Sequence, residues 1–173
     1  YGASGNFPLV PGYCVVGQID WVGPQVSGWR VGDWVTGRNP RPLQGVHSHW
    51  GGQAAHHVYS TTSEDRPVLL PPGCQPLDYV IAETAAIARR GVEAARPQAG
   101  ESAVVIGQGL IGALSAAWLS QAGCSVAVVD LEESRLQRSA KLGAALTVRG
   151  DDPSVEQRLQ AFLGDGANIV VEA

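Results

Sequence analysis

The sequence predicts an α/β protein whose two halves differ in character. Residues 1–75 are rich in Gly, Pro and Trp and hold only short β-like runs, which is typical of a small, irregular β barrel or sandwich. Residues 99–173 alternate apolar strand-like runs with helical runs, which predicts a parallel sheet covered by helices on both faces. Between the halves, the alanine-rich stretch 76–98 favours helix and connects them.

Turn signals and apolar spacing give the expected elements. In the first half, strands are expected at 15–16, 19–22, 34–36 and 68–70. In the second half, strands are expected at 103–106, 125–130, 145–148 and 168–171, and helices at 110–122 and 132–142. A further helix is expected before the last strand, because Asp152 can cap its start, Pro153 suits its first position and Gly164 can end it.

The bulk composition excludes several classes of protein. The chain of 173 residues is 45% hydrophobic and 16% charged, so it can bury a core. Its net charge of −4, without a Lys or Arg cluster, argues against a nucleic acid or an anionic membrane as partner. Residues 103–124 are uncharged, but their glycines and glutamines argue against a membrane span.

The cysteines and the chain ends carry two weaker expectations. Three widely separated cysteines form no CxxC pair and no disulfide framework, which suits a reducing, cytoplasmic compartment. The sequence contains no methionine, and its last residues read as a strand that stops abruptly, so we expect a fragment of a longer protein.

The most specific motif is the complete G-x-G-x-x-G run at 107–112. It follows an expected strand and opens an expected helix, and Asp130 ends the next strand 18 residues beyond Gly112. Gly107 permits a tight turn, Gly109 lets a pyrophosphate approach the backbone, and Gly112 lets the helix pack close to the strand. The amides at the helix start, including those of Leu110 and Ile111, are then expected to face the pyrophosphate.

Asp130 predicts which dinucleotide is bound. Its carboxylate can accept hydrogen bonds from the adenosine ribose hydroxyls and would repel a 2′-phosphate, so NAD(H) is expected and NADP(H) is disfavoured. Two alternatives stay open. The loop could be a glycine-rich turn that binds nothing, and Asp130 could serve as a helix N-cap, alone or in addition.

A family resemblance extends along nearly the whole chain. Its motifs are P-L-V-P-G-Y-C-V-V-G at 8–17, Val22-Gly23, G-D-W-V at 32–35, Ala99-Gly100-Glu101, the glycine loop, and A-K-L-G-A at 140–144. These resemble the medium-chain dehydrogenase/reductase superfamily, the zinc-type alcohol and polyol dehydrogenases, whose pattern is P-x-x-x-G-H-E-x-x-G-x-V, V-G and G-D-x-V.

The resemblance implies a fold and an activity. It implies a partial GroES-like substrate domain at 1–75, followed by a partial Rossmann NAD-binding domain at 99–173. It implies hydride transfer between nicotinamide and a small alcohol or carbonyl substrate, and a dimer or tetramer for the full-length protein. It also implies that Arg135, five residues after Asp130, touches the adenosine ribose, although an exposed helix arginine is the plain alternative.

Departures from the family pattern argue against catalytic zinc. Tyr13 and Cys14 stand where the family has His-Glu, and tyrosine is a poor zinc ligand. The resemblance assigns a polyol-type third ligand to the position of Glu83, and the first ligand would precede residue 1. Pro11-Gly12-Tyr13, which reads P-G-Y rather than G-H-E, and G-V-x-x-A at 91–95 resemble a zinc-free branch, some of whose members act on pigments or other secondary metabolites.

Without zinc, a hydrogen-bond donor must polarise the substrate oxygen. Tyr13 is the candidate catalytic residue, although it could simply pack. The four histidines are further candidates as proton donors: His47, His49, His56 and His57. Cys14 could be a cleft thiol, one ligand of an altered metal site, or a small packed side chain.

Two rival functions stay open. One is a dinucleotide-binding sensor or scaffold without turnover. The other is a zinc-dependent enzyme that uses Glu83, Cys14 and an unseen N-terminal cysteine.

Overall fold

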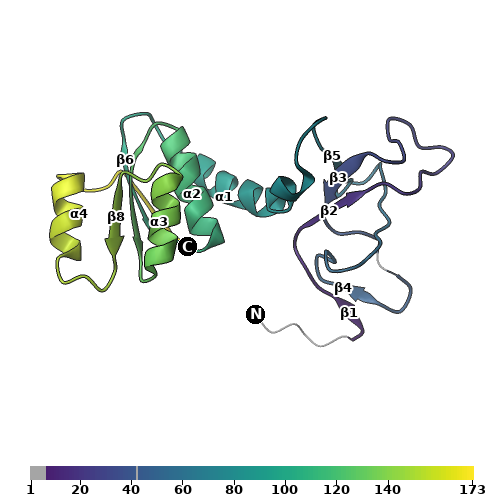
Figure 1. The fold of residues 1–173 in the computed structure, drawn as a ribbon, viewed down its shortest axis with the longest axis horizontal. Helices are drawn as coiled ribbons and strands as arrows, with labels where there is room; N and C mark the ends of the chain where they lie inside the picture. Colours follow the sequence, from purple (N-terminus) through teal and green to yellow (C-terminus); the bar gives the residue numbers. More distant parts are fainter. Residues whose placement is uncertain (1–6, 42) are drawn as a thin grey trace. The chain divides into compact units, whose positions relative to one another are not determined.

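The computed structural model describes residues 7–41 and 43–173. The chain divides into two compact units, Tyr1–Thr84 and Ala85–Ala173. The first contains short strands and loops, and the second contains a four-stranded sheet with helices (Figure 1). This is the expected order of an antiparallel β region followed by a parallel α/β sheet. No helix of the described residues is both long enough and apolar enough to cross a membrane.

The first unit is built on a small antiparallel sheet. Strand β3 (Trp34–Gly37) lies between β2 (Val15–Gln18) and β5 (Val68–Leu69). A separate parallel pair joins β1 (Leu9–Val10) to β4 (His47–Ser48). Side chains in these strands are half-buried or exposed, so this unit owes its shape as much to turns as to an apolar core.

The strand expected at 19–22 is wrong. Strand β2 ends at Gln18, and Ile19 makes the last pairing, with its N–H donating to Asp33 O at 2.9 Å. Gly23 and Pro24 then begin a turn, closed by the Val26 N–H on Gly23 O at 3.0 Å. Proline has no N–H to give to a ladder, so the apolar run before it does not extend the strand.

The second unit is a parallel sheet in the order β8-β7-β6-β9. The strands are β6 (Ser102–Ile106), β7 (Ser125–Asp130), β8 (Leu146–Arg149) and β9 (Ile169–Glu172). The helices of the chain are α1 (Ala82–Ala94), α2 (Leu110–Gln121), α3 (Glu133–Lys141) and α4 (Val155–Leu163). A short 3-10 helix, η1 (Pro76–Tyr79), precedes α1, and η1 and the first residues of α1 fall within the first unit. The stretch 76–98 therefore contains both η1 and α1.

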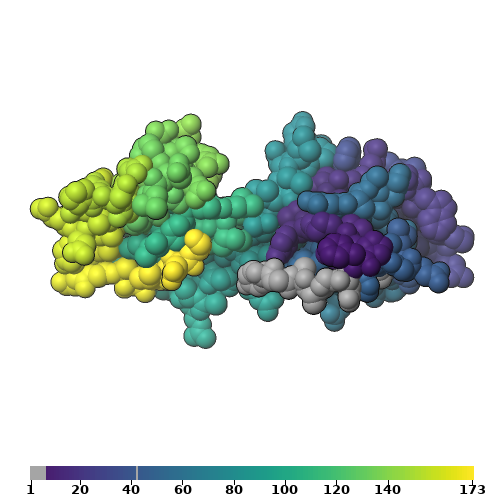
Figure 2. Space-filling view, turned by 90° about the horizontal axis from the view of Figure 1, so that it is seen from below, coloured from purple at the N-terminus to yellow at the C-terminus, as the bar shows by residue number. Residues whose placement is uncertain are grey.

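Helices cover both faces of this sheet. On one face, Val105 and Val128 are buried against Leu119 of α2 and Leu136 of α3. On the other, Val104, Ala127 and Val129 pack against α4 through side chains that include Leu159 and Phe162. Figure 1 shows α4 on the opposite side of the sheet from α2 and α3, and Figure 2 shows α3 and α4 as separate ridges on the surface. Full burial of a Val or Leu side chain, as at Val105, Val128 and Leu119, supplies about 1.5–3 kcal/mol.

The start of α4 differs from expectation. The helix begins at Val155 with Ser154 as its N-cap, rather than at Pro153 after an Asp152 cap. The Asp152 carboxylate instead accepts hydrogen bonds from the Ser154 N–H at 2.8 Å and hydroxyl at 2.7 Å, which closes a turn ahead of the helix. Gly164 ends the helix at a φ of +63°, as expected.

The strand order determines where a ligand can bind. The chain moves from β6 outward through β7 to β8, then returns to the other side of β6 with β9. The strand order therefore reverses between β6 and β9, and in open parallel sheets ligands bind at the carboxyl ends of the strands at such a switch point. The glycine loop 107–109 begins at this point.

Candidate functional site

The glycine loop makes a tight turn out of β6. Gly107 has a φ of +85°, which side-chain-bearing residues rarely adopt, and its N–H donates to Val129 O at 2.8 Å. A Cβ on Gly107 would collide with the carbonyl oxygen of Ala173, which follows β9. The loop therefore passes closely between the ends of β7 and β9, and only glycine fits there.

The other two motif glycines lie in opposite environments. A Cβ on Gly112, in the first turn of α2, would collide with the carbonyl oxygen of Gly107, so the helix start packs directly on the loop. A Cβ on Gly109 would meet no atom within 4 Å. Gly109 is the N-cap of α2 and provides no side-chain cap, so the amides of Leu110 and Ile111 begin the helix beside open space. This arrangement leaves room for an anion at the helix start.

Asp130 lies at the end of β7, beside the loop. Only 8% of the residue is exposed. One carboxylate oxygen accepts the Gln108 N–H at 2.5 Å, and the other accepts the Glu132 N–H at 2.8 Å. The Arg135 guanidinium lies 3.6 Å from the same carboxylate. Glu132, rather than Asp130, is the N-cap residue of α3, although Asp130 does bind its N–H.

These contacts keep Asp130 ionised. Burial alone would raise its pKa, but the hydrogen bonds from the Gln108 and Glu132 amides, together with Arg135, outweigh burial, so the pKa of Asp130 lies below its ordinary value. The site therefore presents a fixed negative charge, able to accept hydrogen bonds from hydroxyl groups and to repel phosphate.

The lowered pKa predicts a pH dependence of stability. Because the folded pKa of Asp130 is depressed, its stabilising contribution is complete above its unfolded pKa of about 4 and is lost as pH falls through the folded value. We expect the stability difference between wild type and Asp130→Asn, from urea unfolding, to shrink steadily below about pH 4. Asp165→Asn removes an exposed carboxylate and controls for the change in net charge. A difference independent of pH would contradict this role for Asp130.

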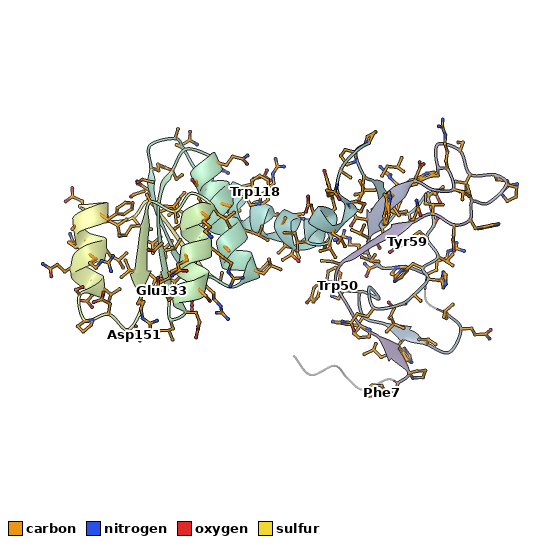
Figure 3. All side chains as sticks on the ribbon, in the orientation of Figure 1. Phe7, Trp50, Tyr59, Trp118, Glu133 and Asp151 are labelled. Atoms are coloured by element: carbon orange, nitrogen blue, oxygen red, sulfur yellow. The ribbon has the colours of Figure 1, made fainter. Side chains whose placement is uncertain are left out.

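Acidic and basic side chains gather at the same end of the sheet. Arg149 ends β8, in register with Asp130, and binds both carboxylate oxygens of Asp151 at 2.9 and 2.7 Å. Figure 3 shows Glu133 and Asp151 at the end of the sheet toward which β8 points. Arg149, the arginine in register with Asp130, therefore already has a carboxylate partner in Asp151.

Gln108, between the first two motif glycines, was not singled out from the sequence. Its side chain is buried, with 3% of the residue exposed. It donates to Val105 O and Gly107 O, at 3.1 and 2.9 Å, and accepts the Ser139 hydroxyl at 2.7 Å. The polar side chain inside a glycine motif could have marked Gln108 in the sequence. Its partner could not be predicted, because Ser139 on α3 lies 31 residues away along the chain.

Tyr13 belongs to the first unit and is 53% exposed. Its ring stacks on Trp50, with 4.9 Å between the ring centroids, which orients the phenol. Among the four histidines, His57 contacts Gly51 O through Nε2 at 2.9 Å, and His56 lies 3.5 Å from the Asp20 carboxylate. Figure 3 shows Trp50 and Tyr59 in this unit. The Tyr13 side chain therefore lies partly exposed, with its ring packed on Trp50.

Glu83 is held by an arginine. Arg38 donates from Nη1 to Glu83 at 2.7 Å and from Nε to Asp65 at 3.1 Å. The hydrogen bond and charge of Glu83, then the charge of Asp65, raise the pKa of Arg38 against the opposing effect of burial. The Cys14 sulfur lies 3.4 Å from the Thr84 hydroxyl, beside Glu83 in sequence.

The described residues gather no complete set of metal ligands of their own. Within residues 7–41 and 43–173, no three His, Cys, Asp or Glu side chains lie close enough together to hold a metal. A carboxylate paired with a guanidinium must lose that partner before it can bind a cation. Whether the protein works without zinc stays a prediction.

The chain is similar to known dehydrogenases. It is 25% identical to the (R,R)-butanediol dehydrogenase of Bacillus subtilis strain 168, over 95% of this chain and 51% of that protein. It thus spans about half the length of the curated relatives it matches. No family model matches the chain.

Solved structures share the fold. The alcohol dehydrogenase TADH from Thermus sp. ATN1 superposes with a TM-score of 0.75 at 24% identity, covering 91% of this chain and 52% of that one. A further match, described as a short chain alcohol dehydrogenase (rspB) from E. coli CFT073, was solved with the cofactor NADH. Its TM-score is 0.70 at 20% identity, covering 91% of this chain and 52% of that chain.

Proposed function

Because this chain belongs to the medium-chain zinc-type alcohol and polyol dehydrogenase family, we propose that its protein is an NAD(H)-dependent oxidoreductase that works without catalytic zinc. The proposed reaction is hydride transfer between nicotinamide and the carbon of a small alcohol or carbonyl compound. The single observation that carries the proposal is the open space over Gly109 beside the ionised, buried carboxylate of Asp130.

The loop supports dinucleotide binding through two separate features. Gly109 and the first amides of α2 offer hydrogen-bond donors to a pyrophosphate, at the positive end of the helix dipole. Asp130 offers acceptors to the adenosine ribose hydroxyls, and Arg135 lies against it. Together, the loop and Asp130 favour NAD(H) over NADP(H), because the 2′-phosphate of NADP(H) would have to approach the Asp130 carboxylate.

The proposed catalysis relies on groups of the chain. When bound, nicotinamide supplies a hydride acceptor or donor at a ring carbon. A proton must leave the alcohol oxygen during oxidation, or reach the carbonyl oxygen during reduction. Tyr13, whose partly exposed ring stacks on Trp50, is the proposed group for this proton. The histidines at 47, 49, 56 and 57 stay candidates for passing it to water.

Nucleotide titration of the full-length protein tests the proposal. NADH and NADPH would be titrated separately, with nicotinamide fluorescence as the readout, and a panel of alcohols and polyols would then be screened with metal-free protein. We expect tighter binding of NADH and NAD-dependent oxidation in the presence of a chelator. Binding without turnover across the panel would favour a sensor or scaffold. A folded protein that binds neither nucleotide would overturn the proposal.

The arginine partner of Glu83 gives a prediction about metal. We expect neither wild type nor Glu83→Gln to hold a stoichiometric zinc ion. We expect Glu83→Gln to lower the free energy of unfolding by about 1 kcal/mol, because the ion pair with Arg38 is partly screened by solvent. Elemental analysis and urea unfolding measure the two quantities. Glu93→Gln, which breaks the more exposed pair with Arg89, is the matched control and should cost less than about 0.5 kcal/mol. One tightly held zinc per wild-type chain, lost in Glu83→Gln, would favour the altered-ligand zinc enzyme.

The remaining expectations follow from the same proposal. The partner is a small-molecule alcohol or carbonyl substrate, and neither a nucleic acid nor a membrane is expected. Assembly into a dimer or tetramer and a cytoplasmic location are likewise proposed for the full-length protein. Light scattering of the purified protein measures whether it forms a dimer or a tetramer.

A further inference from the structure

Gln108 is a buried polar residue inside a loop that faces open space. Its neighbour Gly109 is exposed, with no atom within 4 Å of where a Cβ would lie. Every polar atom of the Gln108 side chain nevertheless has a partner. Nε2 donates to Val105 O and Gly107 O, and Oε1 accepts the Ser139 hydroxyl at 2.7 Å. The side chain thus anchors the inner side of the loop, while the outer side is left for a ligand.

The partner of Gln108 lies on the helix that follows Asp130. Ser139 is completely buried in α3, one turn beyond Arg135, whose guanidinium lies 3.6 Å from Asp130. The backbone N–H of Gln108 also donates to the Asp130 carboxylate. A single residue therefore connects the end of β6, the carboxylate at the end of β7, and helix α3.

We propose that the Gln108–Ser139 hydrogen bond is a positioning element that holds the pyrophosphate-binding loop in its binding geometry before a nucleotide arrives. This inference rests on the proposed function. Gly107 adopts its turn at φ +85°, and its carbonyl is held by Gln108 Nε2, so the direction of the following amides depends on that side chain. A loop that already has its binding conformation does not have to be ordered when the nucleotide binds. The entropy cost of that ordering would otherwise weaken binding.

The position of the bond predicts a distinctive loss. The loop reads the pyrophosphate, which NADH and NADPH share, whereas Asp130 reads the ribose, where they differ. Ser139→Ala should therefore weaken both nucleotides by the same factor, roughly tenfold, as expected when the loss of one buried hydrogen bond loosens the loop. The preference for NADH should not change. At saturating cofactor, kcat should stay near wild type while KM for NADH rises.

A second variant separates positioning from stability. Ser139→Ala leaves Oε1 of Gln108 buried without a donor, which also destabilises the fold. Gln108→Met combined with Ser139→Ala removes Oε1 together with its donor, so the melting temperature should rise above that of Ser139→Ala, although Val105 O and Gly107 O lose the Nε2 donor. Nucleotide affinity should stay reduced, because the loop has still lost its anchor. If Ser139→Ala alone fails to fold, the double variant carries the test.

The experiment measures nucleotide fluorescence titrations and melting temperatures for full-length wild type, both variants and Ser134→Ala, an exposed serine on the same helix. Ser134→Ala should bind like wild type. Unchanged affinity in Ser139→Ala, or affinity that recovers together with stability in the double variant, would overturn the inference and leave the proposed function intact. Wild-type protein that binds neither nucleotide would overturn the proposed function, and this inference with it.

Discussion

Replacing Asp130 with alanine is expected to remove the preference for NADH over NADPH. NADH should bind more weakly, and NADPH should no longer be repelled. The carboxylate offers charged acceptors to the ribose hydroxyls, and each such hydrogen bond contributes about 1.5–3 kcal/mol, so NADH binding should weaken roughly 10- to 100-fold. The same change removes the charge that repels a 2′-phosphate. It also deprives Arg135 of the carboxylate that now lies 3.6 Å away, so a phosphate could take its place.

Parallel fluorescence titrations of wild type and Asp130→Ala with both nucleotides measure this ratio. Asp165→Ala, which removes an exposed carboxylate outside the loop region, controls for net charge and should leave both affinities unchanged. Because the carboxylate also binds the amides of Gln108 and Glu132, the variant should melt at a lower temperature. An unchanged NADH to NADPH ratio in a folded variant would show that Asp130 acts only as a structural acceptor.

The parts of the site that could be predicted from the sequence are those encoded locally. The glycine loop is a short motif whose three glycines each satisfy a steric condition within the strand, turn and helix that contain them. Asp130 ends the next strand, and adjacent parallel strands bring their carboxyl ends together. A close approach of residues 107 and 130 therefore follows from strand order alone, which the alternation of strands and helices predicts.

The parts that could not be predicted depend on contacts between distant residues. Arg38 and Glu83 are 45 residues apart, and Gln108 and Ser139 are 31 apart. No periodicity specifies which buried hydroxyl will meet which amide. A resemblance assigned Glu83 to a metal, whereas the structure pairs it with a guanidinium. The Arg38–Glu83 pair depends on the path of the chain after β3, and the glycines and prolines there predict a turn without specifying that path.

The first unit illustrates the same limit for secondary structure. Its strands have two to four residues, too short for an alternating pattern to be distinguished from chance. The strand expected at 19–22 was an apolar run that a proline turn ends, and the parallel pair β1–β4 joins residues almost 40 positions apart. The sheet of the second unit, with longer and more apolar strands, was predicted closely.

The motif glycines should separate folding from binding. We expect Gly112→Ala to lower the free energy of unfolding by about 3 kcal/mol, because its Cβ would collide with the Gly107 carbonyl and push α2 away from β6. Gly109→Ala should leave stability nearly unchanged, since its Cβ meets no atom within 4 Å. It should nevertheless weaken NADH binding at least roughly tenfold, because the methyl group would occupy space through which a pyrophosphate approaches the backbone.

Urea unfolding and nucleotide titration of the two variants measure these effects side by side. Gly91→Ala is the matched control, because this glycine lies in helix α1, also has no atom within 4 Å of a Cβ, and is outside the loop. Alanine there should stabilise the helix slightly and leave binding unchanged. If Gly109→Ala bound NADH as tightly as wild type, the open space over the loop would not be where the pyrophosphate lies. The nucleotide site would then have to be sought elsewhere on the sheet.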